Sequence, residues 1–120
     1  MNTPIDQPDQ PILFDEAELL DNFGGDREFA ESILETSRLE LPGEIKTLAE
    51  LAEGEDAEAI RNQAHTLKGI AATICAPVLR ATCFKIETAA HDENLESVRQ
   101  MLPELEQTAL KTDAAIGNRI

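Results

Sequence analysis

The chain has 120 residues, the length of a single domain, and it is long enough to close a hydrophobic core. Only 3 % of the residues are aromatic, with no Trp or Tyr, so the core must be built from aliphatic side chains and four Phe, a composition that favours helices. The formal net charge of −14 argues against nucleic acid and anionic membranes as partners, because both attract clustered Lys and Arg.

The beginning of the chain differs in composition from the rest. Residues 1–11 hold three of the six prolines, and we expect them to form a disordered leader ahead of one domain at residues 12–118. The leader lacks the basic and apolar regions of a signal peptide, and no apolar run approaches the roughly 18 residues of a membrane span. The two cysteines form no CxxC pair and lie in apolar segments, as reduced, buried side chains do. We therefore expect a cytoplasmic protein.

The first half of the domain shows two helical patterns and no convincing strand. Asp15 is a candidate N-cap of a short first helix, which a double glycine at residues 24–25 should end. Asp26 can cap a second, longer helix, which Pro42 is expected to kink or split. The apolar stripe of this second helix is predicted at Phe29, Ile33, Ser37, Leu41, Ile45, Leu48 and Ala52.

Three more helices follow. Asp56 can cap the third helix, and Pro77 fits the first turn of the fourth. Asn94 can cap the fifth helix, which Pro103 is expected to bend. The predicted inward positions are Ile60, Ala64, Leu67, Ala71 and Ile74, then Leu79, Cys83, Ile86 and Ala90, then Leu95, Val98, Leu102, Leu105, Ala109 and Ile116. Long amphipathic helices with short connections predict an all-α fold, an antiparallel helical bundle.

A histidine with unusual neighbours lies in the third helix. At about 100° per residue, His65 lies roughly 160° from the inward Leu67, so it is predicted to point outward. The same outward face carries Arg61, Lys68, Gly69 and Ala72. Residues 60–91 carry four basic residues and one acidic residue, whereas residues 1–59 carry three basic and 17 acidic. This composition is what a site for an anionic group or an acidic partner requires, and chance clustering of Arg61, Lys68, Arg80 and Lys85 is the alternative.

The glycine one turn beyond this histidine requires a reason, because glycine inside a helix costs about 1 kcal/mol relative to alanine. We interpret Gly69 as clearance for the surface of another protein that approaches His65. Lys68 would supply positive charge for an anion, and a neutral imidazole nitrogen is a competent nucleophile at pH 7. The combination fits a phosphoryl acceptor.

Two other classes of small helical protein fit less well. A metal-binding bundle would use inward Glu-x-x-His pairs, and neither histidine has Glu three residues before it, so we expect no metal site. An acyl carrier protein is also small and acidic, but it requires a serine in an Asp-Ser-Leu context, and no Asp-Ser pair occurs. The double glycine at residues 24–25 lacks the surroundings of a nucleotide-binding loop, so phosphorylation from ATP is not expected.

The stretch AHTLKG, residues 64–69, resembles the phosphorylation-site signature of the histidine-containing phosphotransfer (HPt) domain family. The likeness covers roughly residues 14–110. Further matching positions are Phe14-Asp15, Leu19-Leu20, Gly24-Gly25-Asp26, Gly54-Glu55-Asp56, Leu79, Cys83 and Glu87. The resemblance implies an antiparallel four-helix bundle with an additional short N-terminal helix lying over one end.

By this resemblance, His65 is phosphorylated on Nε2, Lys68 stabilises the phosphoryl group, and Gly69 gives the partner clearance. The protein would be a relay of a multistep two-component phosphorelay, taking the phosphoryl group from a receiver-domain aspartyl phosphate and passing it to another receiver aspartate. Its expected partners are response-regulator receiver domains and hybrid sensor histidine kinases, which it would meet as a monomer. No cofactor is expected, since the required Mg²⁺ belongs to the receiver. A non-catalytic adaptor that sequesters receiver domains is the alternative.

The expected docking residues are Arg61, Ala72 and Phe84. Phe84 lies about 200° from the inward Ile86 and should therefore be exposed, unless the N-terminal helix covers it. Leu19 and Leu20 cannot both face one core, which would leave one of them to a partner.

Two positions depart from the family pattern. The family usually has Gly where this chain has Cys75, which puts the path between the third and fourth helices in doubt. Ile70 also stands where the family often has Ser, which makes that flank of the site more apolar. The initiator Met and short leader favour a free-standing relay over a piece of a hybrid kinase.

Overall fold

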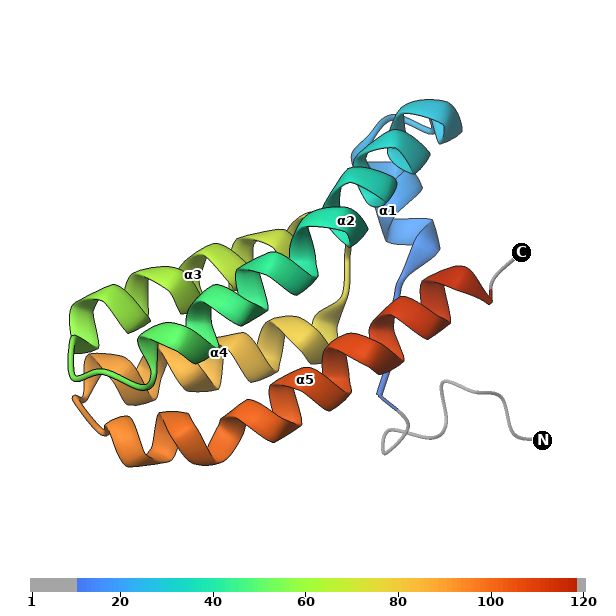
Figure 1. Ribbon diagram of the computed structural model, residues 1–120. Coiled ribbons are helices and arrows are strands. Elements are labelled where there is room, and N and C mark those ends of the chain that lie inside the picture. The colour runs from blue at the N-terminus through green and yellow to red at the C-terminus, as the bar shows by residue number, and fades with distance from the viewer. Residues whose placement is uncertain (1–10, 119–120) are drawn as a thin grey trace.

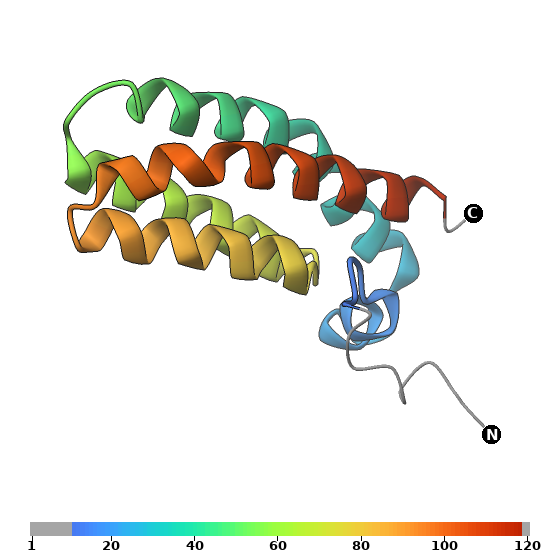
Figure 2. The same cartoon turned by 90° about the horizontal axis from the view of Figure 1, so that it is seen from below.

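Five helices make up the computed structural model of the protein, which describes residues 11–118. They are α1 (Glu16–Asn22), α2 (Arg27–Leu51), α3 (Ala57–Thr73), α4 (Pro77–His91) and α5 (Leu95–Gly117). The four long helices lie side by side as an antiparallel bundle, and α1 lies beyond one end of it, against the projecting N-terminal part of α2 (Figures 1 and 2). The predicted fold, an all-α four-helix bundle with a short N-terminal helix, is confirmed. The expected leader lies, apart from Pro11, outside the described residues.

The helices begin where local sequence signals place them. Each of the four predicted side-chain caps accepts a hydrogen bond from the backbone N–H three residues further on, at 3.0–3.1 Å. These caps are Asp15, Asp26, Asp56 and Asn94. Pro77 occupies the first turn of α4, as predicted.

Neither internal proline splits its helix. Pro42 lies within the 25 residues of α2, and Pro103 lies within the 23 residues of α5. The axis of α2 changes direction between its N-terminal part, cyan in Figure 2, and its green C-terminal part. The buried side chains of Leu41 and Leu48 hold α2 on the bundle on both sides of this region, so tertiary packing outweighs the roughly 3 kcal/mol that an internal proline costs.

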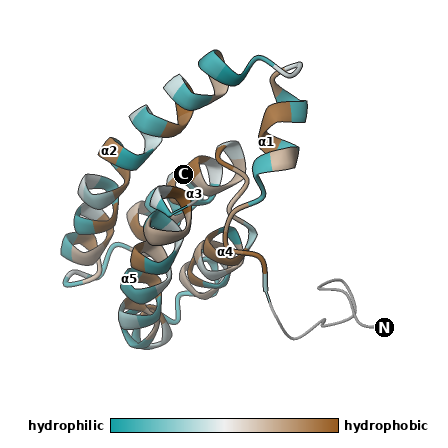
Figure 3. Cartoon of the chain, turned by 90° about the vertical axis from the view of Figure 1, so that its right-hand side faces the viewer, coloured by the Kyte–Doolittle hydropathy of each residue, from teal (hydrophilic) through white to brown (hydrophobic). Residues whose placement is uncertain are grey.

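The bundle core follows the predicted stripes closely in α3 and α4. All nine predicted inward positions of these two helices are buried, and most are inaccessible to solvent. Hydrophobic and hydrophilic residues alternate along each helix at the spacing that amphipathic helices require (Figure 3). In α5, Val98, Leu105 and Ile116 are buried, while the other predicted positions are partly buried against the core.

The predicted stripe is wrong in the first turns of α2. Phe29 is 50 % exposed and packs edge-to-face on Phe23, with ring centroids 5.3 Å apart, whereas Ala30 and Leu34 are buried. This part of α2 diverges from the other long helices and lies beside α1, so its buried side is set by the position of α1. Leu19 of α1 is buried, and its neighbour Leu20 is partly buried against the core rather than left free for a partner.

The α3–α4 connection keeps a path that would suit glycine. Cys75 has the positive φ of 58° that L-residues rarely adopt. The Ala76 N–H donates to the Ala71 carbonyl at 2.9 Å and the Cys75 N–H donates to the Ala72 carbonyl at 3.1 Å, which is a Schellman ending. The Asp15 N–H in turn donates to the Cys75 carbonyl at 2.9 Å. Cys75 therefore adopts the same turn that a glycine would adopt at this position. The hydrogen bond from Asp15 connects the N-terminal end of the domain to this turn.

No helix among the described residues is long and apolar enough to cross a membrane.

Candidate functional site

His65 lies in the middle of α3 and points away from the core, as predicted. Its side chain is 66 % exposed, while the neighbouring Ala64 and Leu67 are fully buried. Because the burial of these two residues sets the rotation of α3 about its axis, the imidazole must point to the outer surface of the bundle.

One carboxylate from the neighbouring helix joins the histidine to the lysine one turn away. Glu87 of α4 places Oε2 2.9 Å from His65 Nδ1 and Oε1 2.8 Å from Lys68 Nζ. The side chain of Glu87 is only 15 % exposed, because it lies between the two packed helices. His65 and Lys68 are thus held on one side of the same acidic group.

This carboxylate is ionised at neutral pH. Burial acts to raise the pKa of the Glu87 carboxyl, but the Lys68 ammonium and the His65 imidazole outweigh it and bring that pKa below its ordinary value. An ionised carboxylate can only accept hydrogen bonds, so the proton of a neutral His65 ring lies on Nδ1, where it is donated to Glu87. Nε2 then carries the unshared electron pair on the exposed side of the ring. The contact therefore selects the tautomer in which the unshared electron pair lies on Nε2.

Lys68 is held from a second direction by an aromatic ring. Its Nζ lies 5.1 Å from the centroid of the Phe84 ring, a cation–π distance, and its side chain is 21 % exposed. Phe84 stands one turn before Glu87 on α4 and is itself 55 % exposed. The prediction that Phe84 is exposed is confirmed, and the alternative that the N-terminal helix covers it is wrong.

The surface beside the histidine is unobstructed. Gly69 is exposed, and a Cβ added there would meet no atom within 4 Å among the described residues, so the interior of the protein does not require glycine at this position. Ala72, one turn further on, is also exposed, and Arg61, one turn before His65, is half-buried. The residues predicted from the sequence to surround His65 therefore lie on one face of α3.

A hollow of about 480 Å³ continues this face toward α2. It is lined by Ile33, Thr36, Ser37 and Glu40 of α2 and by Thr66, Gly69, Ile70 and Thr73 of α3. Its lining is of small, polar and aliphatic side chains. The sequence pattern did not indicate this second wall, because it depends on how α2 packs beside α3.

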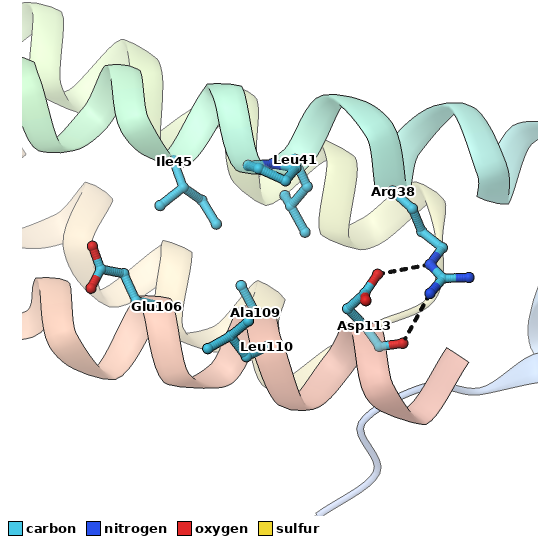
Figure 4. Close-up of a pocket in the computed structure, with 8 residues that line it drawn as sticks. Arg38, Leu41, Ile45, Glu106, Ala109, Leu110 and Asp113 are labelled. Atoms are coloured by element: carbon cyan, nitrogen blue, oxygen red, sulfur yellow. Dashed lines mark hydrogen bonds and ion pairs between the residues drawn. The ribbon is translucent and has the colours of Figure 1, made fainter. Parts of the chain in front are cut away.

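A second hollow, of about 510 Å³, lies on the opposite edge of the bundle, between α2 and α5 (Figure 4). Leu41 and Ile45 face Ala109 and Leu110 across it. At one end Arg38 donates from Nε to Asp113 Oδ1 at 2.8 Å and from a terminal nitrogen to the Asp113 carbonyl at 3.3 Å. The lining of this hollow includes no histidine, cysteine or lysine, so it lacks the chemistry of the α3–α4 edge.

The described residues contain no group of three or more His, Cys, Asp or Glu side chains that could hold a metal ion.

Comparison with known proteins identifies the family. The sequence model of the Hpt domain matches residues 32–111, two thirds of the chain. The chain belongs to the Hpt domain family. A search of curated proteins and a search of solved structures each found no match.

The family defines the class of function. Hpt domains are histidine phosphotransfer intermediates of two-component phosphorelays, and they work with receiver domains and kinases. They carry the phosphoryl group and are not kinases themselves. The matched region of this Hpt domain includes His65, Lys68, Gly69 and Glu87. All four belong to the sequence pattern that resembles the family, but no pattern within one helix assigns a role to Glu87. Its contacts cross from one helix to another.

Proposed function

We propose that this Hpt domain is a relay of a multistep phosphorelay in which His65 Nε2 receives a phosphoryl group from the aspartyl phosphate of one receiver domain and delivers it to the aspartate of another. The observation that carries this proposal is the contact of Glu87 with both His65 and Lys68 at 2.8–2.9 Å. It directs the electron pair of Nε2 outward and keeps a cation beside it.

Transfer on this surface is an in-line displacement at phosphorus. Nε2 of His65 forms the new P–N bond, the P–O bond to the receiver aspartate breaks, and that aspartate leaves as a carboxylate. The ring gains a positive charge, which the Glu87 carboxylate offsets through Nδ1–H. Lys68 neutralises charge on the phosphoryl oxygens, and positioning supplies much of the rate. The Mg²⁺ of such a reaction is expected on the receiver.

The receiver would dock over the exposed face of α3. Gly69 and Ala72 present almost no side chain, so the backbone of a partner can approach the imidazole closely. Phe84 provides apolar contact on one side, the hollow toward α2 offers Ile33 and Ile70 among polar side chains on the other, and Arg61 lies at the edge of the face. A mixture of apolar and polar contacts is usual in a transient interface.

Intact-mass spectrometry at neutral or alkaline pH tests the proposal. The protein is mixed with a receiver that has been phosphorylated by a small molecule, and three forms are compared: wild type, His65→Gln and His91→Gln. His91 is the other histidine of the chain and lies at the exposed end of α4, so its variant is the matched control. Wild type and His91→Gln should gain one acid-labile phosphoryl group, and His65→Gln should gain none. Wild-type protein that binds several receivers and gains no phosphoryl group would instead be the sequestering adaptor.

A further inference from the structure

We propose that Glu87 sets how readily the phosphoryl group leaves His65, so that this carboxylate makes the phosphorylated protein a short-lived donor rather than a stable store. The inference rests on the proposed function, because it concerns the phosphorylated form of the same histidine. It is drawn from the two contacts of Glu87, whose carboxylate is hydrogen-bonded to His65 and ion-paired with Lys68.

The chemistry of the P–N bond explains why the group on Nδ1 matters. When the phosphoryl group leaves, the electron pair of the P–N bond returns to Nε2, and an oxygen of water or of a receiver aspartate forms the new bond to phosphorus. If Nδ1 carries a proton, the departing ring is a neutral imidazole, and its positive charge disappears in the step. If Nδ1 is deprotonated, the departing ring is an anion, which leaves far less readily. The proton on Nδ1 therefore controls the lifetime of the bond.

Glu87 stabilises that proton. Its Oε2 lies 2.9 Å from Nδ1, and the carboxylate is mostly buried while the ring is 66 % exposed, so water screens the attraction in part and the direct hydrogen bond adds to it. A glutamine of the same shape could still accept the hydrogen bond through its amide oxygen, but it carries no charge. A hydrogen bond to an ionised acceptor is about twice as strong as one between neutral groups. The carboxylate thus keeps the phosphorylated ring in its reactive, protonated form to a higher pH than an amide would.

The second contact of Glu87 acts in the same direction. Lys68 Nζ lies 2.8 Å from the buried Oε1, so both charge and a hydrogen bond hold the ammonium at the carboxylate. A phosphoryl group on Nε2 must share this ammonium with the carboxylate. With glutamine at position 87 the ammonium would be attracted to the phosphoryl oxygens alone, which would stabilise the phosphorylated state.

The surroundings of Glu87 leave few other groups to produce this pH dependence. His65 and Lys68 of α3 face the carboxylate, and the Cys83 thiol lies one turn before it on α4. Burial, together with the charge of Glu87, raises the pKa of Cys83 to about 12, so this thiol is neutral throughout the working range. No described residue of α2 or α5 is among the groups that shift the pKa of Glu87.

The lifetime of the phosphorylated protein tests the inference without any receiver. Wild type and Glu87→Gln are phosphorylated directly with phosphoramidate, freed of the reagent, and followed by intact mass from about pH 6 to pH 10. Glu104→Gln is the matched control, because Glu104 is an exposed carboxylate of α5 that pairs with Lys85 across helices and lies outside the site. Circular dichroism at each pH reports whether the variants remain folded.

At about pH 8 we expect wild type and Glu104→Gln to lose the phosphoryl group several-fold faster than Glu87→Gln. The pH at which the decay rate falls to half of its low-pH value should be about one unit lower in Glu87→Gln than in wild type. Equal lifetimes and equal pH midpoints would overturn the inference, as would faster decay of the variant. A merely structural role of Glu87 would not move this midpoint.

A measurement on wild type alone provides a second test. Nitrogen-15 NMR of the phosphorylated ring should show Nδ1 protonated at a pH where a phosphohistidine in an unstructured peptide has lost that proton. A ring that titrates as in the peptide would overturn the inference. The outcome is separable from that of the proposed function: a receiver that fails to phosphorylate His65 contradicts the relay, while the chemically phosphorylated protein still reports the effect of Glu87.

Discussion

Two edges of the bundle are each crossed by a carboxylate–cation contact, and they differ in what the contact does. At the α3–α4 edge, Glu87 is 15 % exposed and holds both His65 and Lys68. At the α2–α5 edge, Asp113 and Arg38 are 54 % and 34 % exposed and close one end of an apolar hollow. The first contact sets the tautomer of an exposed imidazole, whereas the second ties two helices together.

An ion pair acquires a chemical role when its carboxylate also contacts a reactive side chain. Exposed pairs contribute little to stability, with a typical range of about 0–1 kcal/mol. A partly buried carboxylate with two partners constrains the positions of both, and one of them here has a nucleophilic nitrogen directed at solvent. Substitutions of buried apolar residues at the α2–α5 edge should change stability and spare phosphorylation, whereas substitutions around His65 should change phosphorylation more than stability.

The largest effect is expected at the α2–α5 edge. Leu41→Ala should lower the free energy of unfolding by about 2–5 kcal/mol, because Leu41 is 6 % exposed and its removal leaves a cavity beside the hollow. Urea unfolding measures the loss. Leu110→Ala, in the same hollow but 69 % exposed, is the control and should stay within about 0.5 kcal/mol of wild type. Loss of phosphoryl uptake by the folded Leu41→Ala protein would break the contrast between the two edges.

The next effect is expected in the rate of transfer. Lys68→Ala should slow phosphoryl transfer from a receiver about 100-fold, or about 2.7 kcal/mol in the barrier, since it removes the cation beside the transferred group. Rapid-quench measurement of the phosphorylated protein gives the rate. Lys85→Ala removes an exposed lysine of α4 that pairs with Glu104 and should leave the rate unchanged. Equal slowing in both variants would indicate a general effect of positive charge and no specific role of Lys68.

A smaller effect should separate folding from docking. Gly69→Ala should raise the free energy of unfolding by about 1 kcal/mol, because alanine favours the helix and its Cβ meets no atom of the described protein. Transfer from a receiver should nevertheless slow, since the added methyl group lies where the partner approaches. Uptake from phosphoramidate, which is small, should be unaffected. If the receiver transferred at the wild-type rate, Gly69 would not be a clearance position.

The smallest effect is expected in the pH dependence of stability. Because the pKa of Glu87 is lowered in the folded protein, its contribution to stability is present above the ordinary pKa of a glutamic acid and is lost as pH falls through the folded value. The difference in free energy of unfolding between wild type and Glu87→Gln should therefore shrink between about pH 5 and pH 3. Urea unfolding at both pH values measures it. A difference that grew on acidification would contradict the assigned direction.

Local patterns were sufficient to predict much of this molecule. The rotation of α3 follows from Ala64 and Leu67 alone, so the outward direction of His65 could be predicted without knowing any neighbouring helix. The helix starts could be predicted because a cap and its N–H donor lie three residues apart in the sequence.

Features that depend on contacts between helices could not be predicted from the sequence. The buried side of the first turns of α2 depends on α1, and so Phe29 was wrongly expected in the core. The role of Glu87 depends on the register between α3 and α4, which no spacing within one helix reveals. Pro42 showed that packing on both sides can keep one helix continuous where local chemistry predicts an interruption.

The two buried cysteines make this protein convenient for labelling. Burial is the main cause that raises the pKa of Cys75 to about 11 and that of Cys83 to about 12. The thiolate is the form that reacts with maleimides, so neither native thiol should be modified at neutral pH while the protein is folded. A fluorophore could then be attached to a single cysteine introduced at the exposed Ala81 of α4, away from the face of Gly69 and Ala72 that the partner approaches. The arrival and departure of a receiver could be followed in real time on the wild-type core.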